Sequence, residues 1–204
     1  MIDVRWQDKA FVSTGDGVGY NLVHQRGLHV GIGMAYDLGR KERADYLDLR
    51  GMGDQSLSAA PKGFVTWVVS ERFPMVVRAD WRHLLRSGGG SIGDVGAYLP
   101  MPGSSSRFVY FLGPSITIAN RRYLRDSFGV TSMQSIASDH PGYLIQHSGV
   151  EAYRVGLTAD WRFADHYLLN ASSAANHLGH SAIDSPIVER ASSHAIAISI
   201  DYQF

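Results

Sequence analysis

The chain has 204 residues, with 19 basic and 19 acidic side chains, a formal net charge of zero and no cysteine. A length of this order suits one domain. The balanced charge argues against a nucleic-acid-binding surface, and the lack of cysteine excludes disulfides and thiolate metal sites. We therefore expect no nucleic-acid partner. We also expect no transmembrane helix, because no apolar run reaches about 18 residues.

Bulky apolar side chains alternate with small or polar ones along much of the chain, a pattern that predicts β-strands. The pattern is clearest near the C-terminus, where Ile196, Ile198 and Ile200 alternate with alanine and serine. A kink is expected at 15–17 within the second strand. Ten segments are expected to form strands: 2–6, 10–23, 27–38, 63–72, 75–85, 92–101, 107–119, 150–163, 166–177 and 194–204.

The sizes of the side chains indicate which face of these strands lies inside. One face is mostly glycine, alanine, serine and threonine, which fits a narrow lumen, whereas the bulky aliphatic and aromatic face fits contact with lipid. A soluble sandwich or barrel would turn its bulky face inward. We therefore predict an all-β fold, an antiparallel up-and-down transmembrane β-barrel with about ten strands, forming one domain over residues 1–204.

The connections between the expected strands alternate in length. Short connections at 24–26, 73–74, 102–106 and 164–165 alternate with long ones at 39–62, 86–91, 120–149 and 178–193. Short periplasmic turns and long external loops are typical of bacterial outer-membrane barrels. This asymmetry predicts a Gram-negative outer-membrane protein whose C-terminus faces the periplasm. Residues 121–138 contain few helix breakers and are expected to carry a short amphipathic helix over the barrel mouth.

Charged residues on the small-residue face form the strongest polar cluster. A charge inside a narrow barrel must be paired or hydrated. We interpret the cluster as a structural ion-pair network that fills the lumen, and the alternative is a path for small solutes or ions. The predicted network consists of Arg78, Asp80, Arg82, Arg154, Asp160, Arg162 and Asp201.

No residue pattern in the chain indicates catalysis, a cofactor or a metal ion. His147 and Ser148 are adjacent, so in an extended strand they would point to opposite faces and could not pair as base and nucleophile. His177 and His180 lack the spacing of a helical zinc pair, and the glycine-rich segment 87–91 lacks the Lys-Ser/Thr of a phosphate loop. We expect no enzyme activity, no cofactor and no metal site.

Five stretches of the sequence resemble the MipA/OmpV family, also called MltA-interacting proteins, over about residues 2–204. These stretches are 17–22 (GVGYNL), 27–40, 49–54 (LRGMGD), 113–117 (GPSIT) with Tyr123 and 128–131 (FGVT), and, most specifically, 184–189 (DSPIVE). The resemblance implies an outer-membrane location and, for the best-known member, a scaffold role linking a lytic murein transglycosylase to a murein synthase. Other members are described as antigens or adhesins. Family members usually begin with a signal peptide and one further strand region before the point that matches Ile2. This chain is expected to lack both, so the full-length protein is expected to have as many as 12 strands.

Two further features complete the expected function. The segment Asp184, Ser185, Pro186, Ile187, Val188 and Glu189 is expected either to fold into the barrel mouth or to contact a partner. Tyr202 and Phe204 match the C-terminal aromatic signal for barrel assembly, and they also suit an aromatic girdle. The predicted function is a structural or scaffolding barrel that contacts outer-membrane lipid and murein-synthesising and murein-cleaving proteins. The alternative is a passive pore for small solutes.

Overall fold

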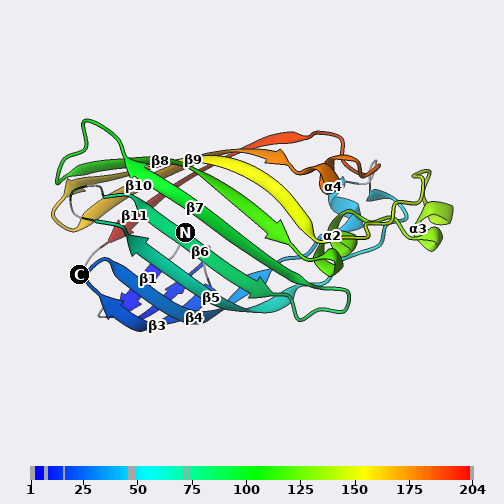
Figure 1. Cartoon of the computed structure of the whole chain (residues 1–204), viewed down its shortest axis with the longest axis horizontal. Coiled ribbons are helices and arrows are strands. Elements are labelled where there is room, and N and C mark those ends of the chain that lie inside the picture. Colours follow the sequence, from blue (N-terminus) through cyan, green and yellow to red (C-terminus); the bar gives the residue numbers. More distant parts are fainter. Residues whose placement is uncertain are drawn as a thin grey trace.

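The computed structural model describes residues 3–6, 9–15, 17–45, 49–70, 72 and 74–202, and the side chains of these residues except those of 3–6, 44–45 and 201–202. The described part contains eleven strands that pair antiparallel in chain order within one sheet (Figure 1). They are β1 (Asp3–Trp6), β2 (Ala10–Ser13), β3 (Gly17–Gln25), β4 (Leu28–Asp37), β5 (Ser58–Val68), β6 (Val76–His83), β7 (Ser91–Pro100), β8 (Phe108–Ala119), β9 (Gly149–Ala164), β10 (Tyr167–Leu178) and β11 (Ser192–Tyr202). The predicted all-antiparallel, up-and-down topology is confirmed. No pairing joins β1 to β11 in the described part, so the sheet is open there.

The expected strand 10–23 is wrong in one respect, because it consists of two strands, β2 and β3, joined by a turn. The expected kink is this reversal. Gly17 has a φ of +80°, and a Cβ added to it would lie 2.1 Å from the carbonyl oxygen of Met34. Only glycine tolerates both the positive φ and the close approach of a neighbouring strand. The start of β5 also differs from the expectation, since this strand begins at Ser58 and includes Pro61.

The sheet is strongly curved. The rings of Phe11 in β2 and Phe64 in β5 lie edge to face with centroids 5.6 Å apart, although β3 and β4 separate their strands. In a flat sheet, three strand spacings would place β2 and β5 about 14 Å apart. Both rings lie over glycines, since a Cβ on Gly19 would meet Phe11 and a Cβ on Gly31 would meet Phe64. Small residues on the inner face therefore make room for the few large side chains inside.

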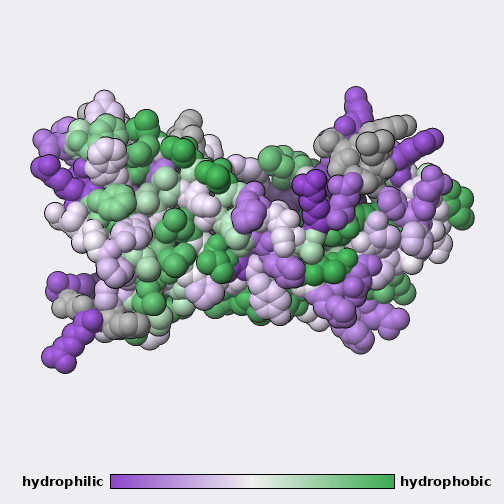
Figure 2. All heavy atoms as spheres, turned by 90° about the horizontal axis from the view of Figure 1, so that it is seen from above, coloured by the Kyte–Doolittle hydropathy of each residue, from purple (hydrophilic) through white to green (hydrophobic). Residues whose placement is uncertain are grey.

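The bulky face of the strands points outward. Ile196, Ile198 and Ile200 are 77%, 68% and 61% exposed, while Thr117 and Ala152 on the opposite face are buried. Hydrophobic residues cover much of the barrel section, and hydrophilic residues gather toward its two ends (Figure 2). This arrangement agrees with the predicted assignment of the two faces and is opposite to that of a soluble barrel.

The long connections lie together at one end of the sheet, and the short turns and the C-terminus lie at the other (Figure 1). The long connections, residues 38–57, 84–90, 120–148 and 179–191, form what we call the cap. They contain η1 (Glu42–Asp45), α2 (Arg121–Phe128), α3 (Ser132–Ala137) and α4 (His180–Ile183). The helix expected in 121–138 is present as two helices, capped by Asn120 and Thr131. No described helix is both long and apolar enough to cross a membrane.

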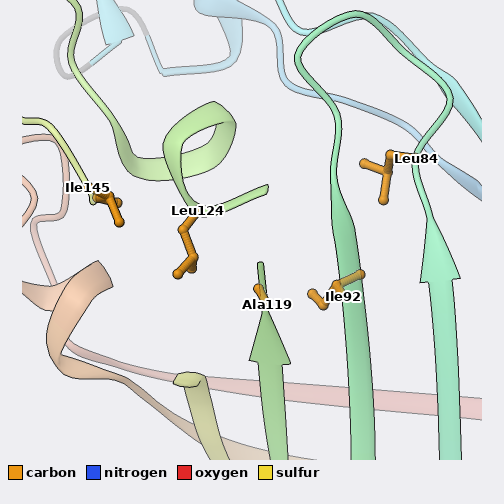
Figure 3. Close-up of a cluster of buried hydrophobic side chains, with 5 residues drawn as sticks. All are labelled: Leu84, Ile92, Ala119, Leu124 and Ile145. Atoms are coloured by element: carbon orange, nitrogen blue, oxygen red, sulfur yellow. The ribbon is translucent and has the colours of Figure 1, made fainter. Parts of the chain in front are cut away.

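A small apolar core joins the cap to the barrel wall. Leu124 of α2 is fully buried, and it belongs to a cluster with Ile92 of β7 and Ala119 of β8 (Figure 3). Leu84 and Ile145, from two cap connections, complete the cluster. Because these residues come from two strands and two cap connections, the cluster attaches the cap to the barrel wall.

Candidate functional site

The inner face carries an ion cluster centred on Asp94 of β7. The Asp94 carboxylate lies 3.1 Å from the guanidinium of Arg82 and 2.8 Å from that of Arg154, and it accepts a hydrogen bond from the buried Thr117 hydroxyl at 2.5 Å. Four neighbouring strands, β6 to β9, thus supply one member each. Asp80 of β6 stands directly opposite Asp94 in the register. Two facing carboxylates would repel, and the two arginines offset that repulsion.

The structure brings together only part of the predicted lumen network. Arg82 and Arg154 meet through Asp94, which was not predicted. Asp160 instead accepts a hydrogen bond from the side-chain amide of Asn170 at 2.5 Å. Arg162 is exposed near the turn between β9 and β10. Arg78 and Asp80 line one cavity together with Arg82 and Arg154, and Asp80 also faces Asp94 in the register. The side chain of Asp201 lies outside the described residues.

Two cavities lie along the inner face. The larger, of 590 Å³, is lined by charged residues including Lys62, Arg78 and Asp80, and by Phe11 and Phe64. The smaller, of 310 Å³, is lined mainly by small side chains of β9, β10 and β11. Arg78 and Tyr98 line both cavities. The interior is therefore polar and hollow between the wall and the few large side chains that cross it.

Glu151 is an inward-facing acid that the sequence analysis missed. The register between β8 and β9 shifts at Thr117 and Ile118, which leaves Glu151 as the extra residue of a bulge. Its carboxylate is within electrostatic reach of Arg82 and Arg154, and its Oε2 atom is buried without a hydrogen-bond partner among the described residues. In an unbroken strand Glu151 would point outward, because the odd-numbered residues of β9 lie on the outward face. An acid at a position in phase with an apolar face was the signal that could have indicated a bulge.

A second ion cluster holds the cap together. The side chain of Arg86 is only 4% exposed; its Nη2 lies 2.9 Å from the Asp126 carboxylate of α2, and its Nη1 donates to Asp37 at the end of β4. Gln55 donates to the Asp126 carbonyl and links a third connection to α2. Beside this cluster, burial raises the pKa of Tyr123 to about 12, and the nearby Glu151 carboxylate adds to the shift. Tyr123 is therefore neutral at any physiological pH.

The Asp184–Glu189 segment lies in the cap, at the opposite end of the barrel from the C-terminus. Ser185 is buried and donates to the carbonyl of Phe128 at 2.6 Å, which ties the segment to α2. Asp184 and Glu189, at its ends, are exposed. The middle of the segment is thus packed into the mouth, and its charged ends remain accessible. The side chain of Tyr202, and Phe204 altogether, lie outside the described residues, so the assembly signal stays a prediction.

The histidines are dispersed. His24 and His29 face each other across the hairpin of β3 and β4, with 3.1 Å between their Nδ1 atoms. Within the described residues, no group of three histidine, cysteine or acidic side chains could hold a metal ion. The Ser148 hydroxyl accepts a hydrogen bond from the Arg121 amide at 3.1 Å and so helps to position the start of α2.

Comparison with protein families identifies the group to which this fold belongs. A family model described as MltA-interacting protein MipA matches residues 1–204. The chain belongs to the MipA family. Because the match covers the whole chain, both the Asp94 cluster and the cap lie within the MipA region. A comparison with curated proteins gave no match.

Proposed function

We propose that this MipA-family protein is a Gram-negative outer-membrane β-barrel that acts as a structural scaffold for murein-remodelling proteins. The band of outward-facing apolar side chains supports the proposed location in the membrane. Ile198, in the middle of β11, is 68% exposed, and outward aliphatic and aromatic side chains recur on most strands. Exposed apolar surface of this extent is unfavourable in water and favourable in hydrocarbon. The family description, MltA-interacting protein, supports the scaffold part.

The short-turn end is the surface we assign to murein partners. In outer-membrane barrels the short turns face the periplasm, where the murein lies. Arg26, Arg72 and Arg107 are exposed in these turns. Under this orientation the Asp184–Glu189 segment faces outside the cell, so a partner bound there would be an external one. The proposed murein contact therefore involves the turns rather than the Asp184–Glu189 segment, for which a partner contact was one of two expectations.

Two experiments test this proposal. Membrane fractionation should recover the folded protein with the outer membrane. Recovery in another fraction would contradict the proposed outer-membrane location. For the scaffold part, the protein is used to capture proteins from an envelope extract. We expect murein-cleaving and murein-synthesising enzymes to be captured, and we expect Arg26→Gln/Arg72→Gln/Arg107→Gln to reduce their recovery. A matched cap variant, Arg43→Gln/Arg122→Gln/Arg190→Gln, should not. Capture of no murein enzyme contradicts the scaffold role.

No enzymatic activity is part of the proposal. The Ser148 hydroxyl, the candidate nucleophile beside His147, accepts a hydrogen bond from the backbone amide of Arg121. Ser148→Ala should therefore leave the lipid composition of the cell unchanged, and an altered lipid profile would contradict this expectation.

A passive pore is the second candidate, and the 590 Å³ polar cavity favours it. The cap opposes it, because the long connections lie together at this end of the barrel and the cluster around Leu124 attaches them to its wall. Planar-bilayer recordings decide between the two functions. Steady conductance that changes in Asp94→Asn would support a pore through the lumen. The absence of any conductance would exclude the pore function.

A further inference from the structure

Helix α2 carries three arginines around a hollow in the surface of the cap. Arg121, Arg122 and Arg125 line a cavity of 440 Å³ together with Gly88 of a neighbouring connection and residues at the start of α3. All three arginines are exposed. Positions three and four apart on a helix are neighbours, so Arg125 lies beside both Arg121 and Arg122. The hollow thus brings three guanidinium groups together on one side of one helix.

The positive charge in this hollow is not balanced within the described part of the protein. None of the three arginines forms an ion pair with a described residue. The one carboxylate that lines the hollow is Asp126, and it already accepts from Arg86 at 2.9 and 3.0 Å. Like charges three and four residues apart repel each other on the surface of a helix. A bound anion would remove that repulsion.

The other walls of the hollow are already held in place. Thr131 and Gln134 bond each other in a capping box, and the Gln134 amide also donates to the Met52 carbonyl at 2.7 Å. Gly88 has a φ of +83°, and a Cβ added to it would lie 2.8 Å from the Asp126 carboxylate. The walls are fixed by their own contacts, and the three guanidinium groups are the charged groups left to face a ligand.

We propose that this hollow binds phosphate groups. A planar guanidinium presents paired N–H donors that match phosphate oxygens, and such charge-assisted bonds are stronger than neutral ones. Helix α2 begins two residues after β8 ends at Ala119, so the hollow lies at the rim of the barrel. The phosphate can come from the phosphorylated headgroup of an outer-leaflet glycolipid or from a soluble polyphosphate. The proposed phosphate site depends only on the geometry of the cap. A lipid as the source of the phosphate depends in addition on the proposed membrane location.

The first arm of the test uses a soluble probe. The full chain is reconstituted in nanodiscs of phosphatidylcholine, and inorganic pyrophosphate is titrated by calorimetry. Losing one charge-assisted bond costs about 1.5 kcal/mol or more, so Arg122→Gln/Arg125→Gln should weaken binding by at least about tenfold. Arg107→Gln/Arg190→Gln removes the same charge elsewhere and should leave binding nearly unchanged. Arg122→Lys/Arg125→Lys keeps the charge without the forked donors and should give an intermediate loss.

The second arm tests the lipid source. Nanodiscs of phosphatidylcholine containing a minor fraction of bisphosphorylated glycolipid are compared with discs containing the same lipid after phosphatase treatment. Mass spectrometry counts the glycolipid that stays with the protein on extraction. Retention that requires both the phosphates and the α2 arginines identifies a headgroup, and pyrophosphate binding without such retention identifies a soluble ligand. If neither probe binds, or if both double glutamine variants lose binding equally, the site is ruled out whatever becomes of the scaffold role.

Discussion

The guanidinium of Arg86 donates from Nε to the carboxylate of Asp126 at 3.0 Å, although 40 residues separate the two in the chain. This bond joins the turn between β6 and β7 to helix α2. The same arginine reaches Asp37 at the end of β4, so one nearly buried cation connects three parts of the mouth. The cap is therefore a folded unit attached to the barrel rather than a set of independent loops.

Replacing Arg86 should destabilise the cap strongly. Arg86→Met leaves the largely buried Asp126 and the more exposed Asp37 without their shared partner, and we expect a loss of about 3 kcal/mol in the free energy of unfolding. Lys41→Met breaks the exposed pair with Asp54 and should cost less than about 1 kcal/mol. Urea unfolding in lipid vesicles, followed by tryptophan fluorescence, measures both. Equal effects of the two variants would show that Arg86 does not hold the cap.

Truncating Leu124 tests the apolar core beneath the cap. Leu124 is fully buried, so Leu124→Ala should cost about 3 kcal/mol through lost burial and the cavity left behind. Ile136→Ala, on α3, removes a side chain that is 84% exposed and should have little effect. Limited proteolysis of the cap, together with urea unfolding, provides the measurement. Cleavage within 120–148 should increase only for the Leu124 variant, and an unchanged pattern contradicts the packing.

A charge on the outward face should be costly in the middle of a strand and tolerated near its end. Ile198→Arg places a cation in the centre of β11, where contact with hydrocarbon costs about 2–4 kcal/mol. His194→Arg lies on the same face near the start of the strand, where the cost falls to about 1 kcal/mol or less. Reversible unfolding from vesicles of phosphatidylcholine compares the two. A small, equal effect at both positions would mean that this face does not contact lipid.

Acid should loosen the connection between β4 and β5. The Asp54 carboxylate accepts from the Glu42 backbone amide at 2.9 Å and from Lys41 at 3.1 Å; in that order, these contacts hold its pKa below the ordinary value. The stabilisation is complete above the ordinary aspartate range, near 3.9, and is lost as the pH falls through the lowered pKa. Hydrogen exchange at the Glu42 amide, followed against pH, should show protection disappearing only below that range. Asp54→Asn should abolish the pH dependence, and a loss of protection at a higher pH would contradict the assignment.

Local patterns in the sequence were sufficient to predict where most strands lie and which face of each strand points outward. Side chains alternate across a strand with a period of two, so Ile196, Ile198 and Ile200 fall on one face whatever the strand pairs with. Connection lengths, read in the same way, placed the cap at one end and the turns at the other. The turn at Gly17 was only half recognised, because a glycine in an alternating segment indicates either a bend or a full reversal.

The sites were less predictable because they depend on neighbours that are distant in the chain. Asp94 was omitted from the lumen network because residues 92–101 alternate poorly, and only the sheet register places it between Arg82 and Arg154. Glu151 turns inward because a bulge breaks the period of two. The three arginines of α2 are left to face a ligand only because the fold of the cap pairs the neighbouring Asp126 with Arg86.

The sequence by itself determined an all-β chain whose strands each have one apolar face and one face of small residues. It also determined the long connections at one end and the likeness to MipA proteins. All of these features depend on residues that are close together in the chain. The tertiary structure alone decided which charges meet, that Glu151 faces inward and that four connections close over the mouth. Side-chain pairing depends on strand register, curvature and packing between distant segments, and these are properties of the whole fold.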